Sequence, residues 1–167
     1  AEYGPLLAEP GAAEHAVCRV GGVLASHVLW RVAEARAGGV VLPIGMIGLV
    51  YTDPRLRGQG LATRALGLAL DEIAARGAVL AALWSEKREF YARLGFEPAG
   101  VERMLRIDAA LCAAARSALG AVGNAEIDIC GPRDWPQLEA LHAARPSRLT
   151  RPAGWLELLA AAPDCEL

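Results

Sequence analysis

The hydrophobic period of the chain first changes from that of strands to that of a helix between Tyr51 and Leu61, and this change limits the folds that the chain can adopt. Before that point, apolar runs flank glycine pairs at 21–22 and 38–39, which predicts strands joined by tight turns. After it, apolar residues recur at helical spacing, and Gly77 stands where a C-terminal helix cap belongs. The chain therefore passes from a β-meander into mixed α/β structure.

The first part of the chain predicts three antiparallel strands. Residues 17–20 and 23–32 form the first two apolar runs. The third run, Val40 to Tyr51, contains Pro43 and glycines, which favours a long, bent or bulged buried strand over a helix. It is also shorter than the roughly 20 apolar residues that span a bilayer.

The remaining elements alternate between helix and strand. A helical stripe runs from Leu61 to Ile73, and residues 78–84 form a short apolar run typical of a buried strand. Residues 86–94 predict a helix closed by a glycine, and residues 101–107 alternate as a strand. The fold class is therefore α/β (α+β), a mixed and mostly antiparallel sheet flanked by helices.

The character of the chain shifts after residue 108. Residues 109–124 predict an Ala-rich helix and a linker. Residues 125–167 predict a strand (125–129), a helix (134–144, with Asp134 at its N-cap) and a short helix (155–161).

Composition excludes several classes of protein. With 54% hydrophobic residues and a net charge of −2, the chain is too apolar for a disordered linker and lacks the basic surface that nucleic acid or an anionic membrane requires. The four cysteines lie far apart, without zinc-site spacing, which predicts free thiols in a reducing compartment and no metal. No signal segment is evident, so we expect a soluble cytoplasmic protein.

The stretch from Asp53 to Thr63 carries the chemistry. It joins a strand to a helix through small residues, so several backbone N–H groups can point outward beside the positive end of the helix, an arrangement that holds a diphosphate. A tight turn without a ligand is the structural alternative. A dinucleotide-binding oxidoreductase fits less well, because its fingerprint needs a small residue at Thr63 and a parallel βαβ unit.

Two motifs resemble the GCN5-related N-acetyltransferase (GNAT) family. Residues 57–62, Arg-Gly-Gln-Gly-Leu-Ala, match its acetyl-CoA signature, and residues 90–98 match its second motif, Phe-Tyr-x-x-x-Gly-Phe. The two occur in the right order, separated by one helix and one strand. The entry strand and the junction at 83–86 look most like the multi-domain enhanced-intracellular-survival branch.

The resemblance implies roles for particular residues. Acetyl-CoA would be the co-substrate, held between splayed central strands, and Tyr91 would protonate the leaving thiolate as general acid. Ser85 would cap the next helix, with Glu86 in its first turn, and would touch the cofactor. The cofactor-binding set as a whole is Val50, Tyr51, Thr52, Arg57, Gly58, Gln59, Gly60, Leu61, Ala62, Thr63 and Ser85.

The implied reaction is direct acetyl transfer to the amine of a small molecule or peptide. No base is identified: His27 is a candidate but more commonly such a residue is structural, and Asp53 suits the turn before Pro54 better. A cysteine nucleophile is not expected, since no cysteine lies near a predicted position of the cofactor loop. A non-catalytic domain that binds CoA or packs on a partner is the alternative function.

The domain organisation departs from the family. Residues 1–108 would form an acetyl-CoA-binding domain without its usual first strand and helix, and residues 125–167 resemble that missing opening. Either they begin a second such domain, which we favour, or they complete the first sheet in permuted order. A homo-oligomer is also left open.

Overall fold

The computed structural model describes residues 13–100, 110–111, 113–114, 131–151, 154 and 157. They belong to two compact units, Ala1–Glu86 with Pro132–Leu167, and Lys87–Gly131, and each unit is described by itself. The predicted strands at 101–107 and 125–129 and the linker at 120–124 lie outside the described residues, as do most of the helices at 109–119 and 155–161. Within the described residues no helix is long and apolar enough to cross a membrane.

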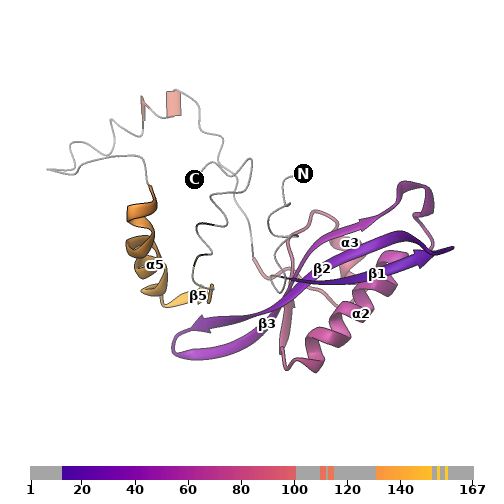
Figure 1. The fold of residues 1–167 in the computed structure, drawn as a ribbon, viewed down its shortest axis with the longest axis horizontal. Coiled ribbons are helices and arrows are strands. Elements are labelled where there is room, and N and C mark those ends of the chain that lie inside the picture. The colour runs from indigo at the N-terminus through magenta and orange to yellow at the C-terminus, as the bar shows by residue number, and fades with distance from the viewer. Residues whose placement is uncertain are drawn as a thin grey trace, which may run out of the picture. The chain divides into compact units, whose positions relative to one another are not determined.

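The predicted meander is confirmed. Strands β1 (Glu14–Val20), β2 (Val23–Ala37) and β3 (Val40–Thr52) pair antiparallel in sequence order (Figure 1). The turns fall on the two glycine pairs, and Gly21 and Gly22 have φ of 58° and 81°. A two-residue turn with positive φ at both positions matches the twist of the strands, and glycine adopts it without strain.

The sheet is mixed, as expected, but its later strands differ from prediction. Strand β4 (Leu80–Ala82) pairs parallel with β3 and is shorter than the predicted run at 78–84. Strand β3 is buried only at Gly45 and Ile47, so the expectation of a buried strand is wrong for most of its length. Its start, Val40 to Leu42, is exposed because α2 covers only the later part of the strand.

Helix α2 (Leu61–Ala75) packs its apolar stripe on the first three strands. The buried members of the stripe are Leu61, Ala65, Leu66, Ala69 and Ile73, as the spacing predicts. Burying one large aliphatic side chain contributes about 1.5–3 kcal/mol. Gly45 allows the helix to approach the sheet closely, because a Cβ at that position would overlap the Ile73 side chain.

The C-terminus of α2 is closed by its own backbone. Gly77 N–H bonds to Ala74 O at 2.9 Å and Ala78 N–H to Ile73 O at 3.2 Å, while Gly77 has a φ of 81°. This pair of bonds is the Schellman motif, which satisfies carbonyls that the helix leaves open.

The described part of the tail contains η2 (Pro132–Asp134), α5 (Trp135–Ala143) and β5 (Ser147–Leu149). The helix was predicted; Asp134 occupies its N-cap position, but its side chain makes no capping hydrogen bond. Strand β5 was not predicted, and it pairs antiparallel with β2 through Ala35↔Leu149 and the two following pairs. That residues 125–167 begin a second domain stays a prediction.

Candidate active site

A bulge interrupts the pairing of β2 with β3 close to the end of β3. His27 is paired with Tyr51 and Leu29 with Gly48, so two residues of β3 stand opposite one residue of β2. Leu49, the first of these two, has a φ of 46°, which non-glycine residues rarely adopt. The bent strand expected from the sequence is thus bulged at this point.

Strands β3 and β4 diverge before the bulge. They pair only over Ile44–Met46 and Leu80–Ala82. Beyond Met46, the part of the first unit that the structure describes offers β3 no further partner on this side. The backbone of Val50, Tyr51 and Thr52 therefore follows an open strand edge, and unpaired N–H and C=O groups at such an edge are free to bond a ligand.

The end of β3 is held by the buried side chain of Ser26 on the neighbouring strand β2. Its hydroxyl donates to Tyr51 O at 2.9 Å and lies 3.0 Å from Thr52 Oγ1. One residue on, Asp53 N–H donates to Ala25 O at 2.9 Å. These bonds hold the strand end rigidly where the loop begins.

Asp53 organises the turn that follows, as predicted. Its carboxylate accepts from Arg55 N–H at 2.9 Å and from the Arg55 guanidinium at 3.1 and 2.7 Å, at the start of η1 (Pro54–Leu56). The hydrogen bonds from the Arg55 side chain, followed by the one from its backbone, lower the pKa of Asp53 to about 2. The turn is therefore held by an ionised carboxylate at neutral pH.

The loop from Arg57 to Gly60 leads into the N-terminus of α2. Gly58 and Gly60 have φ of 80° and 73°, and both are exposed. Arg57 Nε donates to Thr52 O at 3.4 Å, which joins the loop to the strand end. The first helical bond runs from Arg64 N–H to Gly60 O at 3.0 Å.

The amides before that bond have no partner in the helix. They belong to Leu61, Ala62 and Thr63 and, by helix geometry, they project from the positive end of α2. Together with the exposed glycines they form a surface that can hold an anion such as a diphosphate. The residues predicted for the loop are thus brought together.

Cys18 lies at this end of the helix, which the sequence did not indicate. Its thiol donates to Leu61 O at 3.4 Å, from the face of β1 that packs on α2. The premise that no cysteine is near the loop is therefore wrong. The strand pairing that follows from the glycine hairpin could have indicated this position, because it places Cys18 beside Ser26.

The second unit contains α3 (Arg88–Ala92) with the predicted Tyr91. Tyr91 is buried, and its ring meets those of Phe90 and Phe96 edge-on, with centroids 4.9 and 5.8 Å apart. Its carbonyl accepts from Leu94 N–H at 2.9 Å and Phe96 N–H at 3.2 Å, which closes the short helix.

The predicted helix cap before Tyr91 is wrong. Helix α3 starts later than the predicted 86, with Lys87 as N-cap and Glu89 as the acidic residue of its first turn. Ser85 and Glu86 precede the helix, because only residues from Arg88 onward adopt helical geometry. Ser85 is exposed in the segment after β4.

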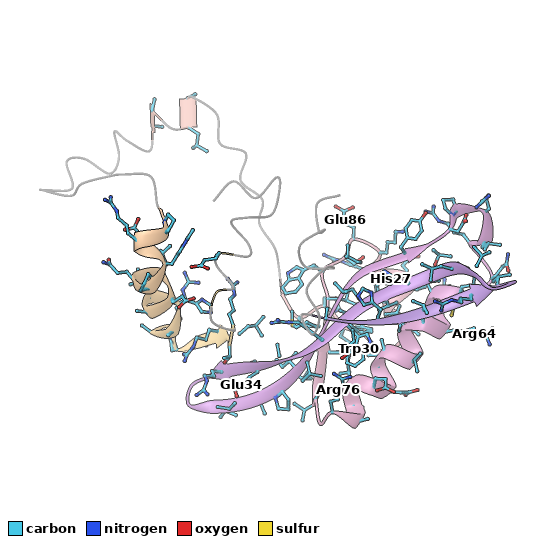
Figure 2. All side chains as sticks on the ribbon, in the orientation of Figure 1. His27, Trp30, Glu34, Arg64, Arg76 and Glu86 are labelled. Carbon is cyan, nitrogen blue, oxygen red and sulfur yellow. The ribbon has the colours of Figure 1, made fainter. Side chains whose placement is uncertain are left out.

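The structure also brings together two histidines whose pairing the sequence did not indicate. His15 on β1 and His27 on β2 lie on the face of the sheet opposite α2, with Nδ1 of His15 2.7 Å from Nε2 of His27. Trp30, labelled with His27 in Figure 2, lies on the other face, where Arg76 stacks over its ring at 4.6 Å. The strand pairing set by the glycine hairpin could have predicted this pair, since it places residue 15 near residues 27–29.

Comparison with known proteins agrees with this geometry. The family model described as an acetyltransferase (GNAT) domain matches residues 7–99. Three solved structures share the fold. A transcriptional regulator from Bacillus halodurans C-125 superposes with a TM-score of 0.52 at 20% identity, covering 59% of this chain and 69% of the other. A candidate acetyltransferase from Agrobacterium tumefaciens str. C58 superposes with a TM-score of 0.53 at 18% identity. The match covers 63% of this chain and 75% of the other.

The third structure is a conserved protein of unknown function from Enterococcus faecalis V583. Its TM-score is 0.52 at 24% identity, and the match covers 57% of this chain but only 24% of that one. At such identities the structures establish the fold alone. The family match covers more than half of the chain and includes both the glycine loop and the Phe90–Pro98 motif, so this chain belongs to the GNAT family of acetyltransferases.

Proposed function

We propose that this domain transfers an acetyl group from acetyl-CoA to a primary amine by direct attack on the thioester. The observation that carries the proposal is the junction of an open β3 edge with the unpaired amides of α2, joined by a loop with two left-handed glycines. An elongated ligand with a diphosphate at one end and amide groups along its length matches these two features in order.

The cofactor would follow the chain from strand to helix. The pantetheine amides would bond the backbone of Val50, Tyr51 and Thr52, whose positions the bulge and Ser26 fix. The pyrophosphate would lie on the amides of Gly58 to Thr63, with Gln59 in the loop and Arg57 closing it. Ser85, on the segment after β4, would contact the cofactor from the other strand.

In the reaction, the amine nitrogen forms a bond to the carbonyl carbon while the carbon–sulfur bond breaks. The thiolate then needs a proton, and Tyr91 would supply it as general acid. Its location in the second motif and its burial support that role, because a buried phenol is held in one orientation. We expect the reaction in the cytoplasm, without a metal.

Thermal unfolding in the presence of acetyl-CoA tests the cofactor. Binding to the folded state alone stabilises it by about 2.7 kcal/mol at a hundredfold excess over the dissociation constant. The melting temperature should rise with acetyl-CoA concentration. It should rise less with analogues that lack the diphosphate, such as pantetheine. No shift at millimolar acetyl-CoA contradicts the proposal.

Turnover is tested separately, with a panel of small-molecule and peptide amines and detection of released CoA. Tyr91→Phe should lower kcat by about 10²–10⁴-fold, because it removes the hydroxyl group that would donate the proton and keeps the aromatic ring. Its affinity for acetyl-CoA should stay at the wild-type value. Binding without turnover of any amine would instead identify a non-catalytic CoA-binding domain.

A further inference from the structure

The two imidazoles opposite α2 form one hydrogen-bonded unit. Their facing nitrogens are 2.7 Å apart and their ring centroids 5.0 Å apart, with the planes tilted by 33°. At that distance one nitrogen donates and the other accepts, so the pair shares a proton. His15 is exposed and His27 is half-buried, so the pair connects the surface of the sheet to solvent.

The inner ring lies beside the bulge of β3. His27 is paired with Tyr51, next to Leu49, the bulge residue with positive φ. On the same face, the next row across the sheet is Leu29 and Gly48, and none of the residues that the structure describes lies within 4 Å of a Cβ built at Gly48. The pair therefore borders open space above the strand that would carry the thioester.

Building on the acetyltransferase activity proposed above, we propose that the His15–His27 pair is the proton acceptor for the attacking amine. The amine nitrogen bonds to the acetyl carbon, and sulfur leaves with the electron pair of the broken bond. The proton lost by nitrogen passes to Nδ1 of His27, the ring nitrogen that does not face His15. The shared proton moves to His15, and His15 releases a proton to water, so both rings return to their neutral form.

The surroundings of His27 suit this role. Burial, and next the charge of His15, lower the pKa of His27 below its usual 6.5, so the ring is neutral and basic at pH 7. The backbone of Leu49 acts more weakly in the opposite direction and raises the pKa of His27. The titratable or charged groups on this face near His27 are His15 from β1, Tyr51 from β3 and Arg31 along β2.

The test compares three single variants of the full chain: His27→Gln, His15→Gln and, as matched control, His142→Gln. His142 is the third histidine of the chain and bonds to Leu149 O from α5. For each, kcat at saturating amine is measured from about pH 5.5 to 9, together with the dissociation constant of acetyl-CoA.

We expect the wild-type kcat to decrease as the pH falls below 6.5, where His27 becomes protonated; this part of the pH profile is its acid limb. His27→Gln should lower kcat by about 10²–10⁴-fold and remove that limb. His15→Gln removes the neighbouring charge that lowers the pKa of His27, so the limb should move to higher pH. The control should match the wild type in both rate and profile.

Two results overturn the inference, and they are distinguishable. If His27→Gln keeps the wild-type kcat and acid limb in an enzyme that turns over, the pair has no part in proton transfer and the proposed function still stands. If the wild type binds acetyl-CoA but acetylates no amine, the proposed function fails and this inference fails with it. Because His15 is exposed, its variant tests the same relay without disturbing the interior.

Discussion

The two ends of helix α2 are both marked by a left-handed glycine, yet the backbone around them is used in opposite ways. At the C-terminus, Gly77 turns the chain so that the following amides bond the last helical carbonyls. At the N-terminus, Gly60 turns the chain so that the first helical amides face outward without a helical partner. The same conformation closes one end and opens the other.

The two ends differ in how their backbone groups are satisfied, and we propose that only the N-terminal end binds a ligand. The C-terminal end is further held by Arg76, which stacks on Trp30 and lies 3.3 Å from the Glu14 carboxylate. A cation there also complements the negative end of the helix dipole. The N-terminal end has glycine exposed to solvent instead, and a ligand would complete its hydrogen bonds.

The largest expected effect comes from filling the open end. The double substitution G58V/G60V places β-branched side chains at two left-handed positions and over the exposed amides. We expect the dissociation constant of acetyl-CoA to rise by about 100-fold or more, since left-handed backbone costs about 1–2 kcal/mol per residue. Titration calorimetry measures it. An unchanged constant would show that the loop does not hold the cofactor.

Next in size is the close approach of α2 to β3. G45A should lower the free energy of unfolding by about 1–3 kcal/mol, because the new methyl group overlaps Ile73, whose branched side chain is stiff. Urea denaturation measures the loss. In an I73A background the same substitution should cost much less, and equal costs in both backgrounds would contradict the packing argument.

The closed end should respond in stability alone. G77A forces alanine into a φ of 81°, with an expected loss of about 1 kcal/mol and a lower melting temperature. Acetyl-CoA affinity, measured under conditions where the protein is folded, should stay at the wild-type value. A loss of affinity like that of G58V/G60V would remove the contrast between the two ends.

The smallest effect concerns acid stability near the open end. The pKa of Asp53 is about 2 when folded and 3.8 in the reference state, so its ionised form stabilises the fold above pH 3.8 and this contribution is lost as the pH falls toward 2. The stability difference between wild type and D53N should therefore shrink across that window. A difference independent of pH would contradict the role of the carboxylate charge.

Local signals predicted the meander and the long helix well. Glycine pairs fixed both hairpin turns, and the apolar stripe from Leu61 to Ile73 identified the buried face of α2. Strand β5 was missed because Ser-Arg-Leu has no strand pattern of its own and pairs only where β2 offers an edge. The late start of α3 was missed because Ser85 and Glu86 fit a capping pattern that the backbone does not use.

The candidate site was predictable where a motif lies within one stretch of chain. The loop residues 57–63 follow one another, so their order alone predicts a shared surface. The pair of His15 and His27, the Ser26–Tyr51 bond and the approach of Cys18 to Leu61 join residues from different elements. They depend on strand register, which shifts at an irregularity in the β1–β2 pair and in the β2–β3 pair and which composition does not reveal.

Strand β5 has a consequence for the edge that strand β2 presents to other molecules. The far end of β2 extends beyond β1, and β5 pairs there with Ala35–Ala37 while Thr150 bonds to Glu34 at 2.7 Å. An unprotected edge of this kind recruits strands from neighbouring molecules, and the adjacent β3 residues Val40–Leu42 are apolar and exposed. A chain cut before Pro132 would leave that edge bare, and we expect it to aggregate more readily than the full chain.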